Sequence, residues 1–257
     1  MIIDNYDGFI FDLDGTIYLG DNLIKGAKKV IKAIKDKNKN YVFLTNKPLS
    51  TRENYAKKLN NLGIKASREN IITSSYVTAE YLKNKKPINC YVIGEKALKK
   101  ELEKVGVNVS NNTENIDYLI ASFDRKFNYK KLNDALQIIK NGAKFIATNP
   151  DKTCPTENGE IPDAAGMIGA IEGTTGKKVE KILGKPSDEI VNIALQNMNI
   201  ENKNTLMIGD RIETDILMGN KNGLSTALVL SGVTNKKLAR TSDVKPNYIL
   251  NTVADLI

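Results

Sequence analysis

The amino-acid sequence predicts an α/β fold, namely a doubly wound parallel-sheet (Rossmann-like) core with an inserted α/β domain. Short apolar, β-branched runs alternate along the chain with segments whose apolar residues recur at helical spacing, as in a parallel sheet covered by helices. Polar side chains directly follow several of these runs, at the position where open parallel sheets bind ligands. No internal repeat and no Pro-, Gly- or Ser-rich linker interrupts the pattern, which excludes repeat arrays and tethered domains.

The first third of the chain contains two strand–helix pairs. Residues 9–11 are predicted as a buried strand, and the helix that follows has an inner face of Ala27, Val30, Ile31 and Ile34. Residues 41–44 are predicted as the next strand. The helix after it begins at a capping box of Ser50 and Glu53 and ends at Gly63.

The rest of the chain continues the alternation. In its middle, strands are predicted at residues 91–93, 118–121 and 145–147. Two helices are predicted between them, and their core-facing apolar residues are Leu98, Leu102 and Val105 in the first and Leu132, Leu136 and Ile139 in the second. Towards its end, the prediction is a helix with Ala165, Ile168 and Ile171, a strand at 181–183, a helix over 190–198, a strand at 205–208, a short helix at 216–217 and a strand at 226–230.

The composition excludes several classes of mechanism. With 257 residues, of which 41% are hydrophobic and 26% charged, the chain has the composition of an ordinary globular protein. It contains no histidine, so Ser-His-Asp and Cys-His mechanisms and His-ligated zinc or iron sites are excluded. Its two cysteines, Cys90 and Cys154, form no metal motif or disulfide framework and are expected to be reduced thiols.

The charge and the N-terminal sequence indicate the partners. The net charge of +8 could attract nucleic acid, but lysines such as Lys28, Lys32 and Lys35 are spread along helix faces without interleaved aromatic residues. We therefore expect no nucleic-acid partner. No window reaches the ~18 apolar residues of a membrane span, and the start of the chain has no signal-peptide pattern, so we expect a cytoplasmic protein without a membrane partner.

Four sets of polar residues follow predicted strands. They are Asp12 with Asp14, Thr45 with Asn46, Lys185, and Asp210 with Asp215. Two carboxylates ~4 Å apart repel by about 4 kcal/mol at an effective dielectric constant of ~20, so several of them together need a cation. With oxygen ligands only, the hard ion Mg²⁺ fits best, held by one or two carboxylates, substrate phosphate and water.

The same residue types suggest a reaction with a phosphate ester. Asp12 is the candidate nucleophile, since a carboxylate can attack phosphorus and form an aspartyl-phosphate. Asp14 lies two residues on, where a turn at Gly15 lets it act as general acid and base. Lys185 would supply positive charge to the phosphoryl oxygens, and Thr45 and Asn46 would donate hydrogen bonds that position them.

These motifs resemble those of a known family. Residues 12–16, Asp-Leu-Asp-Gly-Thr, are similar to the nucleophile motif of the haloacid dehalogenase superfamily of phosphohydrolases. Thr45-Asn46, Lys185 and residues 209–215 match the second, third and fourth motifs in the order of that superfamily. The resemblance implies that Mg²⁺ is held by Asp12, by the backbone carbonyl of Asp14 and by Asp210, while Asp215 orients the metal ligands.

The long interval between Thr45 and Lys185 indicates an insertion, since the other motifs are one strand–helix unit apart. We expect a core of residues 1–82 and 181–257 and an inserted cap of residues 83–180. Segments 147–151, 164–170 and 184–187 resemble the subgroup of nitrophenylphosphatases, phosphoglycolate-type phosphatases and, most of all, arabinose-operon sugar phosphatases. By that resemblance Asn149 is a substrate contact, although a turn around Pro150 would also explain it.

The sequence thus predicts a Mg²⁺-dependent phosphatase of small phosphomonoesters, with sugar phosphates preferred by resemblance and p-nitrophenyl phosphate as an artificial substrate. A phosphomutase, a signalling domain that stores a phosphoryl group on the same aspartate, and a binding protein without turnover are the alternatives. Lys47 and Arg211 depart from many relatives, and Cys154 lies in a loop that could face substrate, so these residues leave the substrate open. A monomer and a homodimer also remain open.

Overall fold

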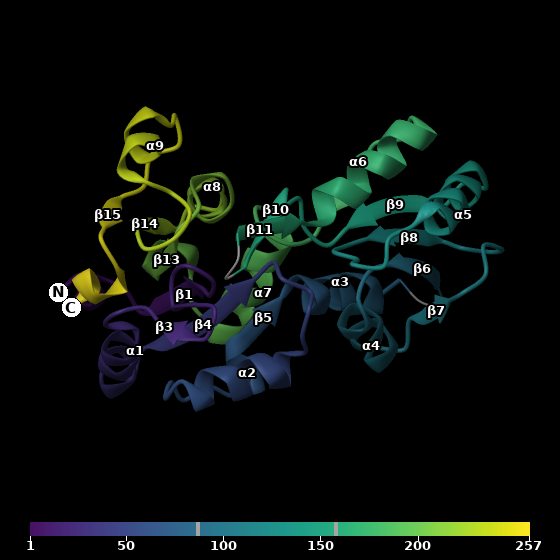
Figure 1. Cartoon of the computed structure of the whole chain (residues 1–257). Coiled ribbons are helices and arrows are strands. Elements are labelled where there is room, and N and C mark those ends of the chain that lie inside the picture. The colour runs from purple at the N-terminus through teal and green to yellow at the C-terminus, as the bar shows by residue number, and fades with distance from the viewer. Residues whose placement is uncertain (86–87, 157–158) are drawn as a thin grey trace. The chain divides into compact units, whose positions relative to one another are not determined.

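The computed structural model describes residues 1–85, 88–156 and 159–257 (Figure 1). The chain forms two compact units and passes between them four times. The first unit consists of Met1–Thr45, Arg52–Ile72 and Pro186–Ile257, and the second of Asn46–Thr51 and Thr73–Lys185.

The first unit is built on a six-stranded sheet. Its strand order is β15 (Tyr248–Leu250), β14 (Ser225–Val229), β13 (Thr205–Gly209), β1 (Gly8–Asp12), β4 (Asn40–Thr45) and β5 (Ile71–Thr73). The pairings from β15 to β4 are all parallel. From β1 the chain continues to β4 on one side, whereas β13, β14 and β15 extend the sheet on the other. The strand order therefore reverses between β1 and β13, and open α/β sheets bind their ligands at such a point.

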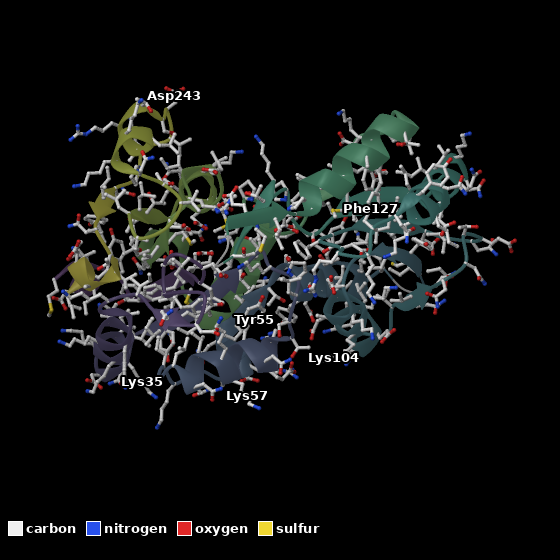
Figure 2. The ribbon with its side chains drawn as sticks, viewed as in Figure 1. Lys35, Tyr55, Lys57, Lys104, Phe127 and Asp243 are labelled. Atoms are coloured by element: carbon white, nitrogen blue, oxygen red, sulfur yellow. The ribbon has the colours of Figure 1, made fainter. Side chains whose placement is uncertain are left out.

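Helices and short turns complete this unit. They are α1 (Ala27–Asp36), α2 (Arg52–Asn61), α7 (Asp188–Met198), α8 (Leu217–Lys221), α9 (Lys236–Thr241), the π-helix Ile212–Ile216, the 3₁₀ turns Ile2–Asn5, Arg68–Asn70, Asn202–Asn204 and Val253–Leu256, and the hairpin of β2 (Tyr18–Leu19) with β3 (Asn22–Leu23). One core cluster joins Phe9, Phe11 and Phe43 of the sheet to the buried face of α1. Lys35 on α1 and Lys57 on α2, both labelled in Figure 2, are exposed.

The second unit has its own parallel sheet of five strands. Their order is β12 (Lys181–Ile182), β9 (Lys144–Ala147), β8 (Tyr118–Ala121), β6 (Asn89–Ile93) and β7 (Asn108–Ser110). The helices are α3 (Ser74–Lys83), α4 (Lys96–Lys104), α5 (Tyr129–Lys140) and α6 (Ala164–Thr175), and β10 (Thr153–Thr156) pairs with β11 (Gly159–Pro162) as an antiparallel hairpin. A core cluster between α5, α6 and the sheet contains Leu119, Ile138 and Ile168.

The predicted fold class is confirmed, and the strands and helices predicted along the chain are present. Some boundaries and faces differ. α2 begins at Arg52, so Thr51 and not Ser50 precedes it. α5 buries Ala135, Ile138 and Ile139, whereas the predicted Leu132 and Leu136 are half-buried. The predicted buried face of α5 differs from the observed one because apolar residues occur on two adjacent sides of this helix.

Several helices and strands of the structure were not predicted from the sequence. The clearest is α3, whose buried residues are Ser74, Ser75, Val77, Thr78, Ala79 and Leu82. Half of them carry a hydroxyl group, so no apolar stripe marks the helix. β5, β7, β15 and the two hairpins are short, and their apolar runs are too brief to stand out.

The limits of the two compact units differ from the predicted domain limits. The second unit begins at Thr73, includes Asn46–Thr51 and ends at Lys185, whereas the cap was placed at residues 83–180. The functional division into a core of 1–82 and 181–257 and a cap stays a prediction. Among the helices in the described part of the chain, none combines the length and apolarity that a membrane crossing requires.

Replacement of Phe43 by alanine tests the core of the first unit. Phe43 is fully buried between the rings of Phe11 and Tyr41, so Phe43→Ala is expected to lower the free energy of unfolding by about 3–5 kcal/mol. Tyr129→Ala is the control, because 84% of this side chain is exposed, and its effect should stay within about 0.5 kcal/mol. Urea denaturation of both variants measures the difference, and equal effects would contradict the assignment of this core.

Candidate active site

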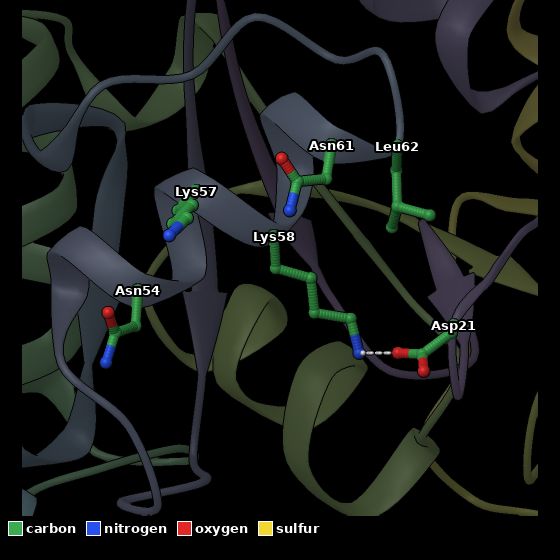
Figure 3. Close-up of a pocket in the computed structure, with 6 residues that line it drawn as sticks. All are labelled: Asp21, Asn54, Lys57, Lys58, Asn61 and Leu62. Atoms are coloured by element: carbon green, nitrogen blue, oxygen red, sulfur yellow. Dashed lines mark ion pairs between the residues drawn. The ribbon is translucent and has the colours of Figure 1, made fainter.

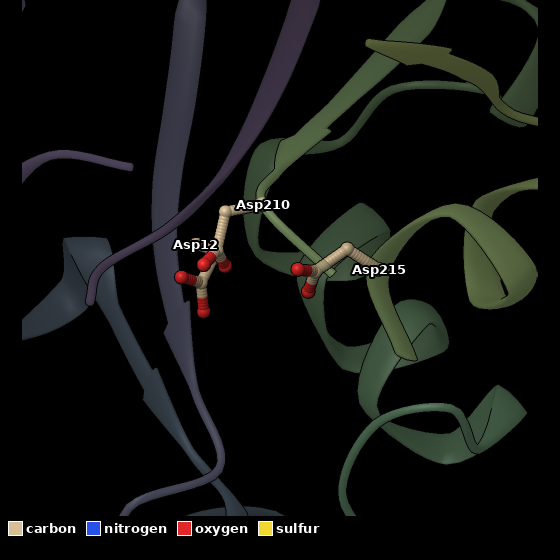
Figure 4. A group of neighbouring side chains, drawn as sticks. All are labelled: Asp12, Asp210 and Asp215. Atoms are coloured by element: carbon tan, nitrogen blue, oxygen red, sulfur yellow. The ribbon is translucent and has the colours of Figure 1, made fainter. Parts of the chain in front are cut away.

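Three aspartates meet at the carboxyl edge of the first sheet. Asp12 is the last residue of β1, Asp210 follows β13 directly, and Asp215 lies in the π-helix Ile212–Ile216. Each offers a carboxylate oxygen, these oxygens lie within 4.8 Å of one another, and all three residues are buried (Figure 4). Because β1 and β13 are adjacent and parallel, their ends bring Asp12 and Asp210 together at the point where the strand order reverses.

Backbone N–H groups hold two of these carboxylates. The N–H of Val233 donates to Asp210 Oδ2 at 2.7 Å, and the N–H of Arg211 donates to Asp215 Oδ2 at 3.0 Å. Hydrogen bonds to an ionised acceptor are short and strong, so they fix the orientation of each carboxylate. An N–H group carries only a partial positive charge, so a cation would lower the repulsion among the three carboxylates further.

The donor set of this cluster fits Mg²⁺. It consists of carboxylate oxygens and contains no sulfur or imidazole. Hard divalent cations prefer such oxygen ligands. Two neighbouring hydroxyl groups, those of Thr214 and Thr234, are buried without a hydrogen-bond partner in the described part of the chain. Buried polar atoms of this kind complete their hydrogen bonds with a ligand or with water.

Three glycines make room for the carboxylates. A Cβ atom on Gly232 would lie 1.9 Å from Asp210 Oδ2, and one on Gly209 would lie 2.3 Å from Asp215 Cγ. A Cβ atom on Gly15 would lie 2.5 Å from Asp210 Oδ2, and its φ of +85° also favours glycine. No other residue type fits at these positions without moving the acids.

The loop after β14 is a part of the site that the sequence analysis missed. Ser231 Oγ donates to the carbonyl oxygen of Gly15 at 2.7 Å, and the N–H of Thr234 donates to the carbonyl oxygen of Asp210 at 3.1 Å. The loop thereby joins the turn after β1 to the turn after β13. The rule that revealed the other motifs would have found it, since Ser231 and Gly232 directly follow the predicted strand 226–230.

Asp14 and Thr45 belong to the same unit as the three acids. Asp14 is half-buried in a turn closed by the N–H of Gly15, which donates to the carbonyl oxygen of Tyr18 at 2.8 Å. Burial, and next the charge of Asp14, raise the pKa of the Tyr18 hydroxyl group, so this phenol stays protonated. Thr45 is buried at the end of β4, the strand beside β1.

The remaining predicted site residues, Asn46, Lys185 and Asn149, lie buried in the second unit. Asn46 Oδ1 accepts from the backbone N–H of Lys185 at 2.8 Å, and Asn46 Nδ2 donates to the carbonyl oxygen of Lys185 at 3.1 Å. Asn149 Nδ2 instead donates to Asp163 Oδ1 at 3.1 Å. The structure therefore brings Asn46 and Lys185 into contact, while the roles of all three residues in binding stay predictions.

Asp163 is a second residue that the sequence analysis missed. It caps α6 by accepting from the N–H of Ala164 at 2.6 Å, in addition to its bond with Asn149. Burial raises the pKa of the Asp163 carboxyl group, whereas hydrogen bonds and the charge of Lys47 act in the opposite direction. Lys47 therefore places a positive charge near Asp163 in this unit.

Two buried cysteines and one open pocket have no role in the proposed reaction. Cys90 and Cys154 are buried thiols, and burial raises the pKa of the Cys90 thiol to about 12, which keeps it protonated. The pocket of about 450 Å³ beside α2 is drawn in Figure 3 and is lined by Asp21, Asn54, Lys57, Lys58, Asn61 and Leu62. Lys58 pairs there with Asp21 at 3.1 Å and donates to the carbonyl oxygen of Gly20, so its charge is engaged within the protein.

Comparison with known proteins gives matches over nearly the whole chain. Residues 9–108 match the model of a family described as haloacid dehalogenase-like hydrolase, and residues 182–256 match one described as HAD-hydrolase-like. The sugar-phosphatase AraL of Bacillus subtilis is 38% identical over 97% of this chain and 91% of its own.

Solved structures show the same similarity. The 4-nitrophenylphosphatase of Thermotoga maritima is 32% identical, with a TM-score of 0.94 over 100% of this chain and 98% of that one. The glycerol phosphate phosphatase of Mycobacterium tuberculosis, solved in complex with magnesium, is 27% identical, with a TM-score of 0.91 over 99% of this chain and 77% of that one.

Substitution of Gly232 tests the geometry around Asp210. The methyl group of Gly232→Ala must displace the Asp210 carboxylate, so we expect the affinity for Mg²⁺ to fall at least about tenfold, the effect of a lost ~1.4 kcal/mol. Gly169→Ala in α6 is the control, since its methyl group meets nothing within 4 Å. Calorimetric titration with Mg²⁺ measures both affinities, and an unchanged affinity in Gly232→Ala would contradict the arrangement described here.

Asp163→Asn tests the burial of that carboxyl group. Asparagine keeps the acceptor that caps α6, but it does not titrate. Because the folded-state pKa of Asp163 is raised, the wild-type protein loses stability as pH rises from about 4 through that pKa, and the variant does not. The unfolding free energy of the variant minus that of the wild type should therefore increase from pH 3 to 7. A difference that is constant with pH would contradict the raised pKa.

Proposed function

This chain belongs to the family of haloacid dehalogenase-like hydrolases, and we propose that it is a Mg²⁺-dependent phosphatase that hydrolyses small phosphomonoesters through an aspartyl-phosphate. The observation that carries the proposal is the cluster of Asp12, Asp210 and Asp215, with their carboxylate oxygens within 4.8 Å of one another at the reversal of strand order. Three buried acids at that place have no packing role, and they suit a reaction that needs a cation beside a nucleophilic carboxylate.

Mg²⁺ would be held by Asp12, by the backbone carbonyl of Asp14 and by Asp210. When bound, it would neutralise negative charge on the carboxylates and the phosphoryl oxygens. Asp215, which is anchored by the N–H of Arg211, would orient the metal ligands. The magnesium complex of the related glycerol phosphate phosphatase supports the choice of ion.

The reaction has two displacements on phosphorus. In the first, a carboxylate oxygen of Asp12 forms a bond to phosphorus while the bond to the ester oxygen breaks, and Asp14 gives its proton to the departing alkoxide. In the second, water attacks the aspartyl-phosphate, Asp14 takes a proton from that water, and the bond to Asp12 breaks. Phosphate and an alcohol leave, and both carboxyl groups return to their starting states.

The other predicted residues are proposed to bind the phosphoryl group or its ester, or to hold a residue that does. Lys185 supplies a fixed positive charge for the phosphoryl oxygens and Thr45 binds them, while Asn46 belongs to this phosphate-binding set through its bonds to the backbone of Lys185. Asn149 is proposed to contact the substrate. A sugar phosphate is the proposed substrate class, in line with the sugar phosphatases among the relatives.

Removal of the metal and substitution of Asp12 test this function. With p-nitrophenyl phosphate as substrate, Asp12→Asn should show no turnover above background, because an amide cannot serve as the nucleophile. Asp14→Asn should lose about 10²–10⁴-fold in kcat, the usual contribution of a general acid and base. EDTA should abolish the activity of the wild-type protein, and added Mg²⁺ should restore it. Released nitrophenol is measured by absorbance.

A buried aspartate outside the site serves as the control. Asp134 accepts from the Tyr91 hydroxyl group at 2.7 Å in the second unit and has no proposed role in the reaction. Asp134→Asn should keep the turnover of the wild-type protein. Turnover that survives EDTA or Asp12→Asn would refute the mechanism, and a phosphorylated alcohol in place of free phosphate among the products would favour a phosphomutase.

A further inference from the structure

The side chain of Asn46 is bonded at both ends to the backbone of one residue, Lys185. The Oδ1 atom accepts from the N–H of Lys185 at 2.8 Å, and the Nδ2 atom donates to its carbonyl oxygen at 3.1 Å. Asn46 and Lys185 are both buried, with 6% and 3% exposed, and they are 139 positions apart in the sequence. An amide that pairs with both polar groups of a residue acts as a neighbouring strand does, and it restrains the backbone on both sides of that residue.

Asn46 itself is held from the other side. Ser74, the first residue of α3, is fully buried and donates from Oγ to the carbonyl oxygen of Asn46 at 2.7 Å. The chain enters the second unit at Asn46 and again at Thr73, and it leaves that unit after Lys185. Hydrogen bonds within the unit thus join three of the places where the chain enters or leaves it.

Gly184 is what allows the close approach. A Cβ atom at this position would lie 2.5 Å from Asn46 Oδ1 and 2.5 Å from the carbonyl oxygen of Thr148. The N–H of Gly184 also donates to that carbonyl oxygen at 2.7 Å. The sequence motif Gly-Lys therefore has a physical reason, because the residue before the lysine must have no side chain if Asn46 is to reach the lysine backbone.

We propose that Asn46 is a positioning residue that acts through Lys185, and that Ser74 supports it by holding the Asn46 backbone. The inference rests on the proposed function, in which the Lys185 ammonium group stabilises the phosphoryl oxygens. A lysine is a point charge on a flexible four-carbon stem, so the placement of that charge depends on a fixed backbone beneath it. A misplacement of 1 Å in such a group can lower a rate by about 10²-fold.

The main test compares Asn46→Ala with a matched asparagine. Asn70 in the first unit also uses both ends of its side chain, since its Oδ1 accepts from the N–H of Ser67 at 3.0 Å and its Nδ2 donates to the carbonyl oxygen of Tyr41 at 3.2 Å. We expect Asn46→Ala to lower kcat/KM for p-nitrophenyl phosphate by about 10²-fold. Asn70→Ala should remain within about threefold of wild type, although both variants lose hydrogen bonds to backbone and should melt at lower temperature.

A double-mutant cycle shows whether Asn46 acts through the lysine. The affinity for inorganic phosphate in the presence of Mg²⁺ is measured by calorimetry for wild type, Asn46→Ala, Lys185→Ala and the double variant. If Asn46 only positions Lys185, its substitution should change the affinity by less than about threefold once the lysine side chain is absent. Losses that multiply would overturn the inference, since they are the result expected if Asn46 contacts phosphate directly.

Hydrogen exchange of the Lys185 amide tests the contact without any catalysis. This amide should be protected in wild type and in Asn70→Ala, and it should exchange at least about tenfold faster in Asn46→Ala. Ser74→Ala should show a smaller increase in the same amide. Unchanged protection in Asn46→Ala would overturn the inference even in an active phosphatase. Conversely, absence of turnover in the wild-type protein would refute the proposed function, while the exchange measurement would still decide whether Asn46 holds Lys185.

Discussion

The repulsion among three buried carboxylates is the constraint on which the candidate site depends. Asp12, Asp210 and Asp215 have oxygens within 4.8 Å of one another, so ionised carboxylates at these positions oppose folding unless their charge is compensated. The surrounding backbone is built to tolerate this arrangement. The N–H groups of Val233 and Arg211 point at two of the acids, and glycines at 15, 209 and 232 leave them space. The arrangement offers three carboxylate oxygens to a cation at one place.

Hydrogen bonds to backbone, more than contacts between side chains, organise both halves of the candidate machinery. In the first unit, Ser231 joins the turn after β1 to the loop after β14. In the second unit, Asn46 joins the segment after β4 to the one that carries Lys185. Backbone atoms move less than long side chains do, so hydrogen bonds of this kind hold the segments that carry the acids and the lysine in fixed positions.

Local patterns allowed most of the fold and the outline of the site to be predicted. Alternating apolar runs and helical stripes are properties of neighbouring residues, so β1, β4, β8, β13 and the helices between them could be identified from short windows. The rule that ligands bind beyond the carboxyl ends of strands then singled out Asp12, Asp210 and Asp215. α3 was missed because its buried face contains hydroxyl groups in place of a stripe of apolar residues.

By itself, the sequence determined the fold class, the order of the motifs and the chemistry available, since these follow from residue types and spacing along the chain. The tertiary structure alone decided which polar groups meet. It placed the amide of Asn46 on a residue 139 positions away, brought the loop at Ser231 to Gly15, and paired Asn149 with Asp163. A hydrogen bond forms over about 3 Å, and no local pattern reports distances between segments that the folded chain brings together.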